Sequence, residues 1–263
     1  MPISEDRYLV IRDKSVIKAN QLIQKSRFSL SLLQQKVVLY LIAQINPFDK
    51  DFIQCEFDIK EFCRVCGIDD LSGKNYADLK QAIKEIADKS LWITLPDGRE
   101  TLIRWIEKPY IDRNNGVIRI KLDEDMKPYL LQLKDNFTRY ELIYTLHFKS
   151  KYTIRMYELV KSIHYHDLQS YSRVFELDEL RKLLDAENYT TYQGFKVKVL
   201  ERAIKEINQY SDKEITYTPI KQGKSVVAIR LDISSKDSIE ALKIREEIDR
   251  EMKFDPDQYT LWD

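Results

Sequence analysis

Basic side chains recur at helical spacing in residues 194–210, which read GFKVKVLERAIKEINQY. On a helix of 3.6 residues per turn, one face carries Lys198, Arg202, Lys205 and Gln209, with Lys196 in the first turn. Glu201 and Glu206 lie on the flanks. Ammonium and guanidinium groups on one side of a helix can bind phosphates and guanine edges, and a helix of this size fits the DNA major groove.

The opposite face of this segment is apolar. Its members follow the i, i+3, i+4, i+7 spacing of a core-facing stripe and are Val197, Leu200, Ala203, Ile204 and Ile207. A surface helix with a solvated charged face has the same pattern, so the segment alone leaves both interpretations open.

Charge is unevenly distributed along the 263-residue chain, although its formal net charge is zero. Residues 236–263 contain five Lys or Arg and nine Asp or Glu, a net of −4, so residues 1–235 carry +4. Nucleic-acid binding depends on where charge gathers rather than on its total. The chain has no apolar run of transmembrane length, no signal sequence, and an odd number of cysteines. We therefore expect a cytoplasmic protein that does not contact a membrane.

Motifs for metal binding and catalysis are weak. Cys63 and Cys66, with Cys55 nearby, suggest zinc, but a structural site needs four ligands and this half of the chain has no further cysteine or histidine. Buried thiols are the better interpretation. There is no phosphate-binding loop of the GxxxxGK[ST] type. We expect no catalytic residues, no metal and no cofactor.

One enzymatic alternative stays open. His164 and His166 flank a tyrosine, and a histidine pair with a tyrosine nucleophile is typical of rolling-circle replication nucleases. Such a pair should lie on a strand, with both imidazoles holding a divalent metal, whereas here it ends an amphipathic helical pattern. A nuclease is therefore the minor alternative.

The two halves of the chain resemble each other. Residues 57–62 (FDIKEF) match 175–180 (FELDEL), and 79–86 (LKQAIKEI) match 200–207 (LERAIKEI). Each half is predicted to run helix, short strand, helix, longer helix, hairpin. That order is a helix-turn-helix followed by a β-hairpin wing, so we predict an α+β fold of two tandem winged-helix domains.

Further motifs, in order along the chain, add a family resemblance. They are 19–22 (ANQL), 32–36 (LLQQK), 137–140 (FTRY), 146–159 (LHFKSKYTIRMYEL) and 195–208 (FKVKVLERAIKEIN). Together they resemble the plasmid replication initiators that bind iterons, the Rep proteins with two winged-helix domains. We expect domains at 1–133 and 134–235, joined at a hinge formed by residues 134–136. An acidic helix and tail, 236–263, follows.

The resemblance implies a function and partners. Such a protein binds directly repeated sequences in double-stranded DNA at a plasmid origin, helps melt the adjacent duplex, and recruits the host replicative helicase with the host initiator protein. It represses its own promoter as a homodimer and initiates as a monomer. It would be plasmid-encoded in bacteria. A winged-helix transcriptional regulator without origin function is the alternative.

The resemblance also assigns roles in the second domain. Lys196 or Lys198 is expected to reach guanine O6 and N7, with less geometric selectivity than arginine. Arg202 and Lys205 are expected at phosphates. Lys221 and Lys224, at the wing tip, are expected to follow the phosphate backbone or the minor groove. Polar groups just before the helix can bind phosphate near its N-terminus, namely Thr190, Thr191 and Gln193.

Weaker candidates lie outside this helix and wing. Lys149, Lys151 and Arg155 begin a helix predicted over 150–164 and are expected near phosphate. Arg155 could instead be a buried partner of Glu158. In the first domain the parallel cations are Lys74, Lys80 and Lys84, which neighbouring acidic residues dilute. We expect that domain to contribute less affinity and to supply the dimer surface through its sheet.

Overall fold

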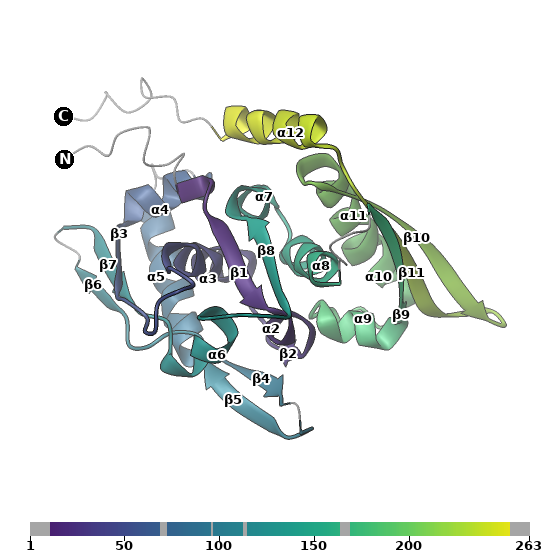
Figure 1. Ribbon diagram of the computed structural model, residues 1–263, viewed down its shortest axis with the longest axis horizontal. Coiled ribbons are helices and arrows are strands. Elements are labelled where there is room, and N and C mark those ends of the chain that lie inside the picture. The colour runs from purple at the N-terminus through teal and green to yellow at the C-terminus, as the bar shows by residue number, and fades with distance from the viewer. Residues whose placement is uncertain (1–10, 69–72, 96, 113–114, 164–168, 253–263) are drawn as a thin grey trace.

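The computed structural model describes residues 11–68, 73–95, 97–112, 115–163 and 169–252 (Figure 1). We divide its elements at the predicted hinge, residues 134–136, into a first and a second module, which contact each other closely through β1 and β8. The first module contains β1 (Ser15–Ala19), α2 (Asn20–Gln24), β2 (Ser26–Arg27), α3 (Leu32–Gln44), β3 (Cys55–Asp58), α4 (Ile59–Val65), α5 (Gly73–Asp88), β4 (Ser90–Thr94), β5 (Glu100–Arg104), β6 (Tyr110–Asp112), β7 (Val117–Ile120), η1 (Glu124–Met126) and α6 (Lys127–Leu130).

The second module begins with a strand and ends with a long helix that returns over its top in Figure 1. It contains β8 (Phe137–Glu141), α7 (Leu142–His147), α8 (Lys151–Ser162), β9 (Ser170–Glu176), α9 (Leu177–Leu183), α10 (Tyr192–Phe195), the π-helical turn η2 (Lys196–Leu200), α11 (Glu201–Tyr210), β10 (Lys213–Gln222), β11 (Ser225–Ser235) and α12 (Ser238–Glu251).

Helix α3 forms the centre of the first module. Its N-terminus is fixed by a capping box, in which the Ser31 hydroxyl accepts from the Gln34 amide and the Gln34 side chain accepts from the Ser31 amide. Residues 34–43 are all buried, so the helix is enclosed on every side. Tyr40 packs edge-on against Phe57 and Phe62, which ties α3 to β3 and α4.

The predicted internal repeat is present in the order of elements. In the first module α3, β3, α4, α5 and the β4–β5 hairpin follow one another, and in the second α8, β9, α9, the helix 192–210 and the β10–β11 hairpin. Phe57 and Phe62 are buried, as are Phe175 and Leu180 at the matching positions.

The sheets of the two modules differ. In the second module the wing strand β11 pairs with β9, giving the order β10-β11-β9. In the first module β3 pairs instead with β7 of a second hairpin, and the β4–β5 hairpin pairs with β2. The first module is therefore an elaborated version of the second.

Residues on both sides of the predicted hinge are held together. Strand β8 pairs antiparallel with β1, and the Asn20 amide donates to the Asn136 carbonyl at 2.7 Å. Below this pair of strands Lys18 forms a buried ion pair with Glu158 of α8, with 2.5 Å between Nζ and Oε1. The strand that follows residue 136 therefore packs on the first module. The division at 133/134 stays a proposal about the extent of the two functional units.

Helix α12 crosses from the second module to the first and packs on α7 and α11. Ile239, Leu242, Ile248 and Met252 are spaced to lie roughly on one face of this helix. Ile248 is buried, but Ile239 and Leu242 are 69% and 54% exposed. The contact with α7 and α11 is made further along, where Ile244 and Ile248 are buried and Met252 is partly buried against the core.

Ion pairs secure the second half of α12 to β8 and to the residues just before β1. Arg245 contacts Asp13 at 2.5 Å and Glu141 at 3.3 Å. Arg12 lies 3.6 Å from Asp249 and donates to the Met252 carbonyl at 3.2 Å. The acidic helix thus connects the two modules directly.

Candidate nucleic-acid interface

The segment 192–210 forms one continuous helical run built from α10, a π-helical turn and α11. Its N-terminus is capped by Thr191, whose hydroxyl accepts from the Gly194 amide at 3.1 Å. A Cβ at position 194 would lie 3.0 Å from that same hydroxyl oxygen, so glycine keeps the cap undisturbed. The apolar stripe then anchors the run to the second module.

The π-helical turn changes which residues are buried. The sequence predicted Val197 on the buried face, but it is 45% exposed, and Val199 is fully buried instead. A π turn adds one residue to a helical turn, so side chains before it are rotated relative to a regular helix. From Leu200 onward the predicted stripe is confirmed, because Leu200, Ala203, Ile204 and Ile207 are buried.

Two lysines of this helical run are exposed and lie outside the ion pairs found among the described residues. They are Lys198 and Lys205. Lys196 is half-buried and lies 3.4 Å from Glu201. An ammonium group without a carboxylate partner can bind an incoming phosphate or base edge without first breaking a contact.

Arg202 connects this helix to the start of α8. Its Nε lies 3.3 Å from Glu206, and its Nη2 donates to the Lys149 carbonyl at 3.2 Å. Glu206 in turn accepts from the Lys149 amide at 3.1 Å. The Arg202 guanidinium is still 55% exposed, so it can contact phosphate while it positions the two helices.

The polar groups before the helix are exposed at its N-terminus. Thr190, Thr191 and Gln193 all face solvent. The Thr191 oxygen serves as the cap, and its hydroxyl hydrogen is left to donate. The Thr190 carbonyl accepts from Arg181 of α9, which fixes the loop beside the helix.

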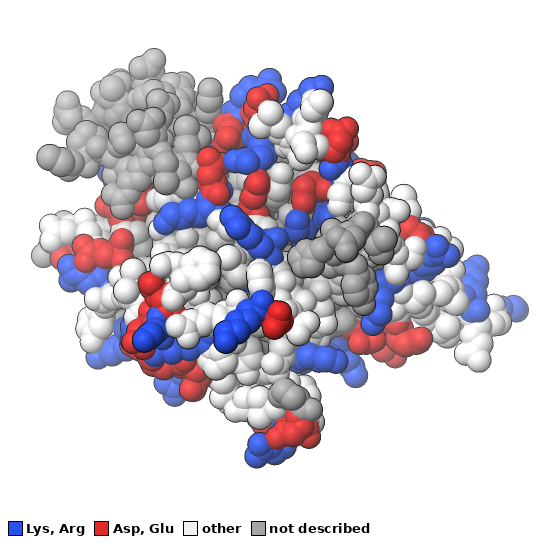
Figure 2. Space-filling model, in the orientation of Figure 1, with Lys and Arg blue, Asp and Glu red and all other residues white. Residues whose placement is uncertain are grey.

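The wing is the long hairpin β10–β11, which projects away from the rest of the second module (Figure 1). Gly223 at its turn has φ of +61°, a conformation that glycine adopts without strain. Lys221 and Lys224 are exposed on either side of it. In Figure 2 basic side chains lie along the wing, whereas acidic and basic groups are interspersed over most of the visible face.

The helix α8 contributes less than the sequence predicted. Lys149 is exposed, but Lys151 is partly buried and paired with Asp185 at 2.5 Å. The expected phosphate contact of Arg155 is wrong, because its side chain is only 5% exposed. Its guanidinium donates to the Leu183 carbonyl at 2.9 Å and lies 3.8 Å from Glu158. The alternative, a buried structural role beside Glu158, is confirmed.

The matching helix of the first module, α5, presents a mixed outer face. Lys80 and Lys84 are exposed, and so are Asp78 and Asp88. Lys74 lies in α5, but its side chain is outside the described residues. The acidic neighbours reduce the positive potential that this helix could offer to a duplex.

The cysteines do not gather into a metal site. Cys55, Cys63 and Cys66 are buried thiols outside any disulfide, and within the described ranges no three potential ligands could hold an ion. Burial raises the pKa of the Cys66 thiol to about 12 and that of Cys55 to about 11. His164 and His166 of the nuclease alternative lie outside the described residues. No described helix is long and apolar enough to span a bilayer.

One group of cations was missed by sequence reasoning. Lys25, Arg27 and Arg173 line a single cavity between the modules. They come from α2, β2 and β9, so no local spacing connects them, and only the folded chain brings them together.

Comparisons with known proteins identify two winged-helix regions, the first of which includes β8, α7 and nearly all of α8, elements that we grouped with the second module. Residues 15–161 match the family model "Initiator Replication protein, WH1", and residues 176–233 match "Initiator Rep protein, WH2". A curated Escherichia coli protein, "Replication initiation protein", is 28% identical over 209 residues, which cover 76% of this chain and 64% of that protein. The chain thus spans less than two thirds of the length of this relative.

A solved structure shares the fold. The chain superimposes with a TM-score of 0.70 on a protein described as "Crystal structure of Pi initiator protein in complex with iteron DNA", over 86% of this chain and 99% of that one. The two sequences are 17% identical. The predicted fold of two winged-helix domains is confirmed by this likeness and by the two family models.

Proposed function

The chain belongs to the initiator replication protein family, and from that premise we propose that it binds repeated sequences (iterons) in double-stranded plasmid origin DNA. It then promotes opening of the adjacent duplex and recruits the host replicative helicase and host initiator protein. It acts by binding rather than by catalysis, in the bacterial cytoplasm. The observation that carries the proposal is the row of exposed cations on the helix 192–210, beside a lysine-tipped wing.

Roles divide between these two parts. Lys198 and Lys205 lie on a helix that can enter a major groove, and the early position of Lys198 suits base contact. Lys221 and Lys224 lie at the end of a projecting hairpin and suit the phosphate backbone. The loop residues Thr190, Thr191 and Gln193, together with Lys149, are proposed to add phosphate contacts at the edge of this surface.

Single substitutions test this division. We expect Lys198→Ala to weaken binding to the specific duplex by about 1–3 kcal/mol, with a smaller effect on random-sequence duplex, because a base contact carries the specificity. Lys224→Ala should weaken both by the same factor, since a phosphate contact is independent of sequence. Titration of labelled specific and random duplexes at constant salt measures the specificity ratio, which is the affinity for the specific duplex divided by the affinity for the random one.

A matched control is Lys243→Ala, which removes an exposed lysine of α12 that has no ion pair among the described residues. It should leave both affinities unchanged. Equal specificity ratios for Lys198→Ala and Lys224→Ala would contradict the proposed roles.

We also propose that the first module supplies the homodimer surface through its sheet. Strand β5 is an edge of the sheet β2-β4-β5, and an edge strand offers unpaired backbone groups to a second chain. Trp92 and Leu102 lie opposite each other on this hairpin and are 49% and 51% exposed. An apolar pair beside a free edge is suited to association.

Charge placed on this pair should oppose association. We expect Leu102→Asp to weaken the dimer by at least about tenfold, because it buries a carboxylate against a second copy of itself. Sedimentation velocity over a range of concentrations measures the shift. Leu242→Asp, at a similarly exposed leucine of α12, is the control. An unchanged monomer–dimer equilibrium in Leu102→Asp would place the dimer surface elsewhere.

A further inference from the structure

A cavity of about 1260 Å³ lies at the junction of the two modules, away from the helix and wing described above. First-module elements α2, β2 and β4 form part of its wall, and β8, the end of α8, and β9 complete it. Helix α8 spans 12 residues, which is about 18 Å. Lys149, just before α8, contacts Arg202 of the candidate DNA-binding helix, and residues 161–163, at the other end of α8, line the cavity.

The lining is strongly basic. The lining contains one carboxylate, Asp135, and six Lys or Arg, which are Lys25, Arg27, Lys134, Arg139, Lys161 and Arg173. Lys161 is neutralised by Asp212 at 2.7 Å. Lys25, Arg27, Lys134, Arg139 and Arg173 have no ion pair among the described residues.

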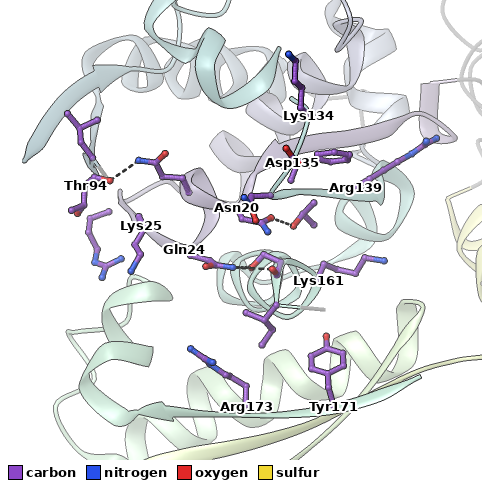
Figure 3. A pocket seen from close by; sticks show the side chains of 18 of the residues that line it. Asn20, Gln24, Lys25, Thr94, Lys134, Asp135, Arg139, Lys161, Tyr171 and Arg173 are labelled. Atoms are coloured by element: carbon purple, nitrogen blue, oxygen red, sulfur yellow. Dashed lines mark hydrogen bonds between the residues drawn. The ribbon is translucent and has the colours of Figure 1, made fainter. Parts of the chain in front are cut away.

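The side chains of these cations point in different directions. In Figure 3 Lys25 and Arg173 extend from opposite walls into the gap between α2 and β9, whereas Lys134 and Arg139 point away from it. Arg27 follows Lys25 by two residues and is exposed at the same cavity. Three cations without carboxylate partners on the facing walls create a local positive potential that favours an anion carrying several charges.

The wall between them is held in place by hydrogen bonds. Gln21 donates to the Thr94 carbonyl at 2.8 Å, and Gln24 donates to the Ser162 carbonyl and hydroxyl at 3.1 Å. Thr138 donates to the Asn20 side chain at 2.6 Å. These contacts fix α2 against β4, α8 and β8, so the basic groups are presented from a supported surface rather than from a loose loop.

We propose that this cavity binds a chain of linked phosphates, either a nucleoside polyphosphate or inorganic polyphosphate. Small-ligand cavities are commonly about 300–1,000 Å³, so there is room for a nucleotide with its phosphates. Linked phosphates concentrate several charges within a short length, which suits three cations on facing walls, whereas a nucleic-acid strand carries one charge per nucleotide. The partly exposed Tyr171 and the exposed Asn136 and Ser172 of the lining can contact a base or sugar.

Titration calorimetry at low salt tests the site, with ATP and inorganic tripolyphosphate as probes. We expect both probes to bind the wild-type chain. The double variant Lys25→Glu with Arg173→Glu should lose at least about tenfold in affinity, because each substitution replaces a cation that attracts phosphate by a carboxylate that repels it. The uncharged double variant Lys25→Gln with Arg173→Gln should lose less affinity for both probes than the glutamate variant. It serves as the test if the glutamate variant is poorly folded.

Controls separate this site from the duplex-binding surface. The double variant Lys50→Glu with Lys243→Glu makes the same change of charge at exposed positions outside the cavity and should bind both probes as the wild type does. Affinity of the cavity variants for duplex origin DNA should change less than about threefold, since the helix 192–210 is untouched. Failure of duplex binding in the wild type would count against the proposed function, not against the cavity.

Three results would overturn the proposal. The first is that the wild type binds neither probe. The second is that the cavity variants and the control variant bind the probes with equal affinity. The third is that the wild type binds an oligothymidylate but neither probe. The last would assign the cavity to a nucleic-acid strand.

Discussion

Replacement of Glu158 by alanine is expected to lower the free energy of unfolding by about 3–5 kcal/mol, a large part of the total for an ordinary domain. Glu158 is 2% exposed and accepts from Lys18 at 2.5 Å, while Arg155 lies 3.8 Å away. Tyr140 also donates to it. Its removal leaves two buried cations and a buried hydroxyl without their shared acceptor. Urea denaturation at pH 7 measures the loss.

The control for this variant is Glu187→Ala, at an exposed glutamate of the loop after α9. It should change stability by less than about 0.5 kcal/mol. In a double-mutant cycle of Lys18→Met and Glu158→Leu, the double variant should lose less unfolding free energy than the two single variants lose together. The reason is that the apolar pair leaves no unpaired partner at that contact. A loss below about 1 kcal/mol for Glu158→Ala would show that the pair does not join β1 to α8.

The same group gives the stability a pH dependence. Burial by itself would raise the pKa of Glu158, but the Lys18 and Arg155 charges outweigh burial and hold that pKa below its ordinary value. A carboxyl group whose pKa is lower in the folded than in the unfolded state stabilises the fold at pH values above its unfolded-state pKa, which is about 4.3 for glutamate. That contribution is lost as pH falls through the folded pKa. The difference in stability between wild type and Glu158→Gln should therefore narrow below about pH 4.

Salt should have the largest effect on DNA binding. Six Lys or Arg of the helix and wing are candidates for phosphate or base contact: Lys196, Lys198, Arg202, Lys205, Lys221 and Lys224. Contacts of this number displace counterions and give an expected slope of log affinity against log salt of about −5. Affinity should then fall about 10³-fold between about 50 and 200 mM salt.

Single variants calibrate this slope. Lys224→Ala should make it shallower by about 0.9, whereas Lys243→Ala, outside the proposed surface, should leave it unchanged. A slope near zero in the wild type would mean that the exposed cations do not meet phosphate.

Local patterns predicted the order of elements well. The apolar stripe from Leu200 to Ile207 and the repeated AIKEI sequence are sufficient to place the two longer helices, because their spacing matches the helical period. The hairpin turns at Gly98, Gly116 and Gly223 are local features too, because glycine adopts the positive φ found at all three without strain. These features are decided within a few residues.

Features that depend on distant contacts were not predictable in this way. Nothing local to Val197 signals the π-helical turn that exposes it and buries Val199. Arg155 looks like other basic residues at a helix start, and only the approach of Leu183, Ile23 and Phe28 makes it a buried group. The pairing of β1 with β8 and the basic cavity likewise require residues separated by more than a hundred positions.

We propose above all that the helix 192–210 reads a DNA site that is repeated in an origin. A hydroxyl-radical footprint of the purified chain on the replicon that encodes it tests this most directly. We expect protected segments recurring at one fixed spacing of about two helical turns, and we expect Lys198→Ala to lose that pattern. A single isolated protected segment, or a repeated pattern that Lys198→Ala leaves unchanged, would contradict it.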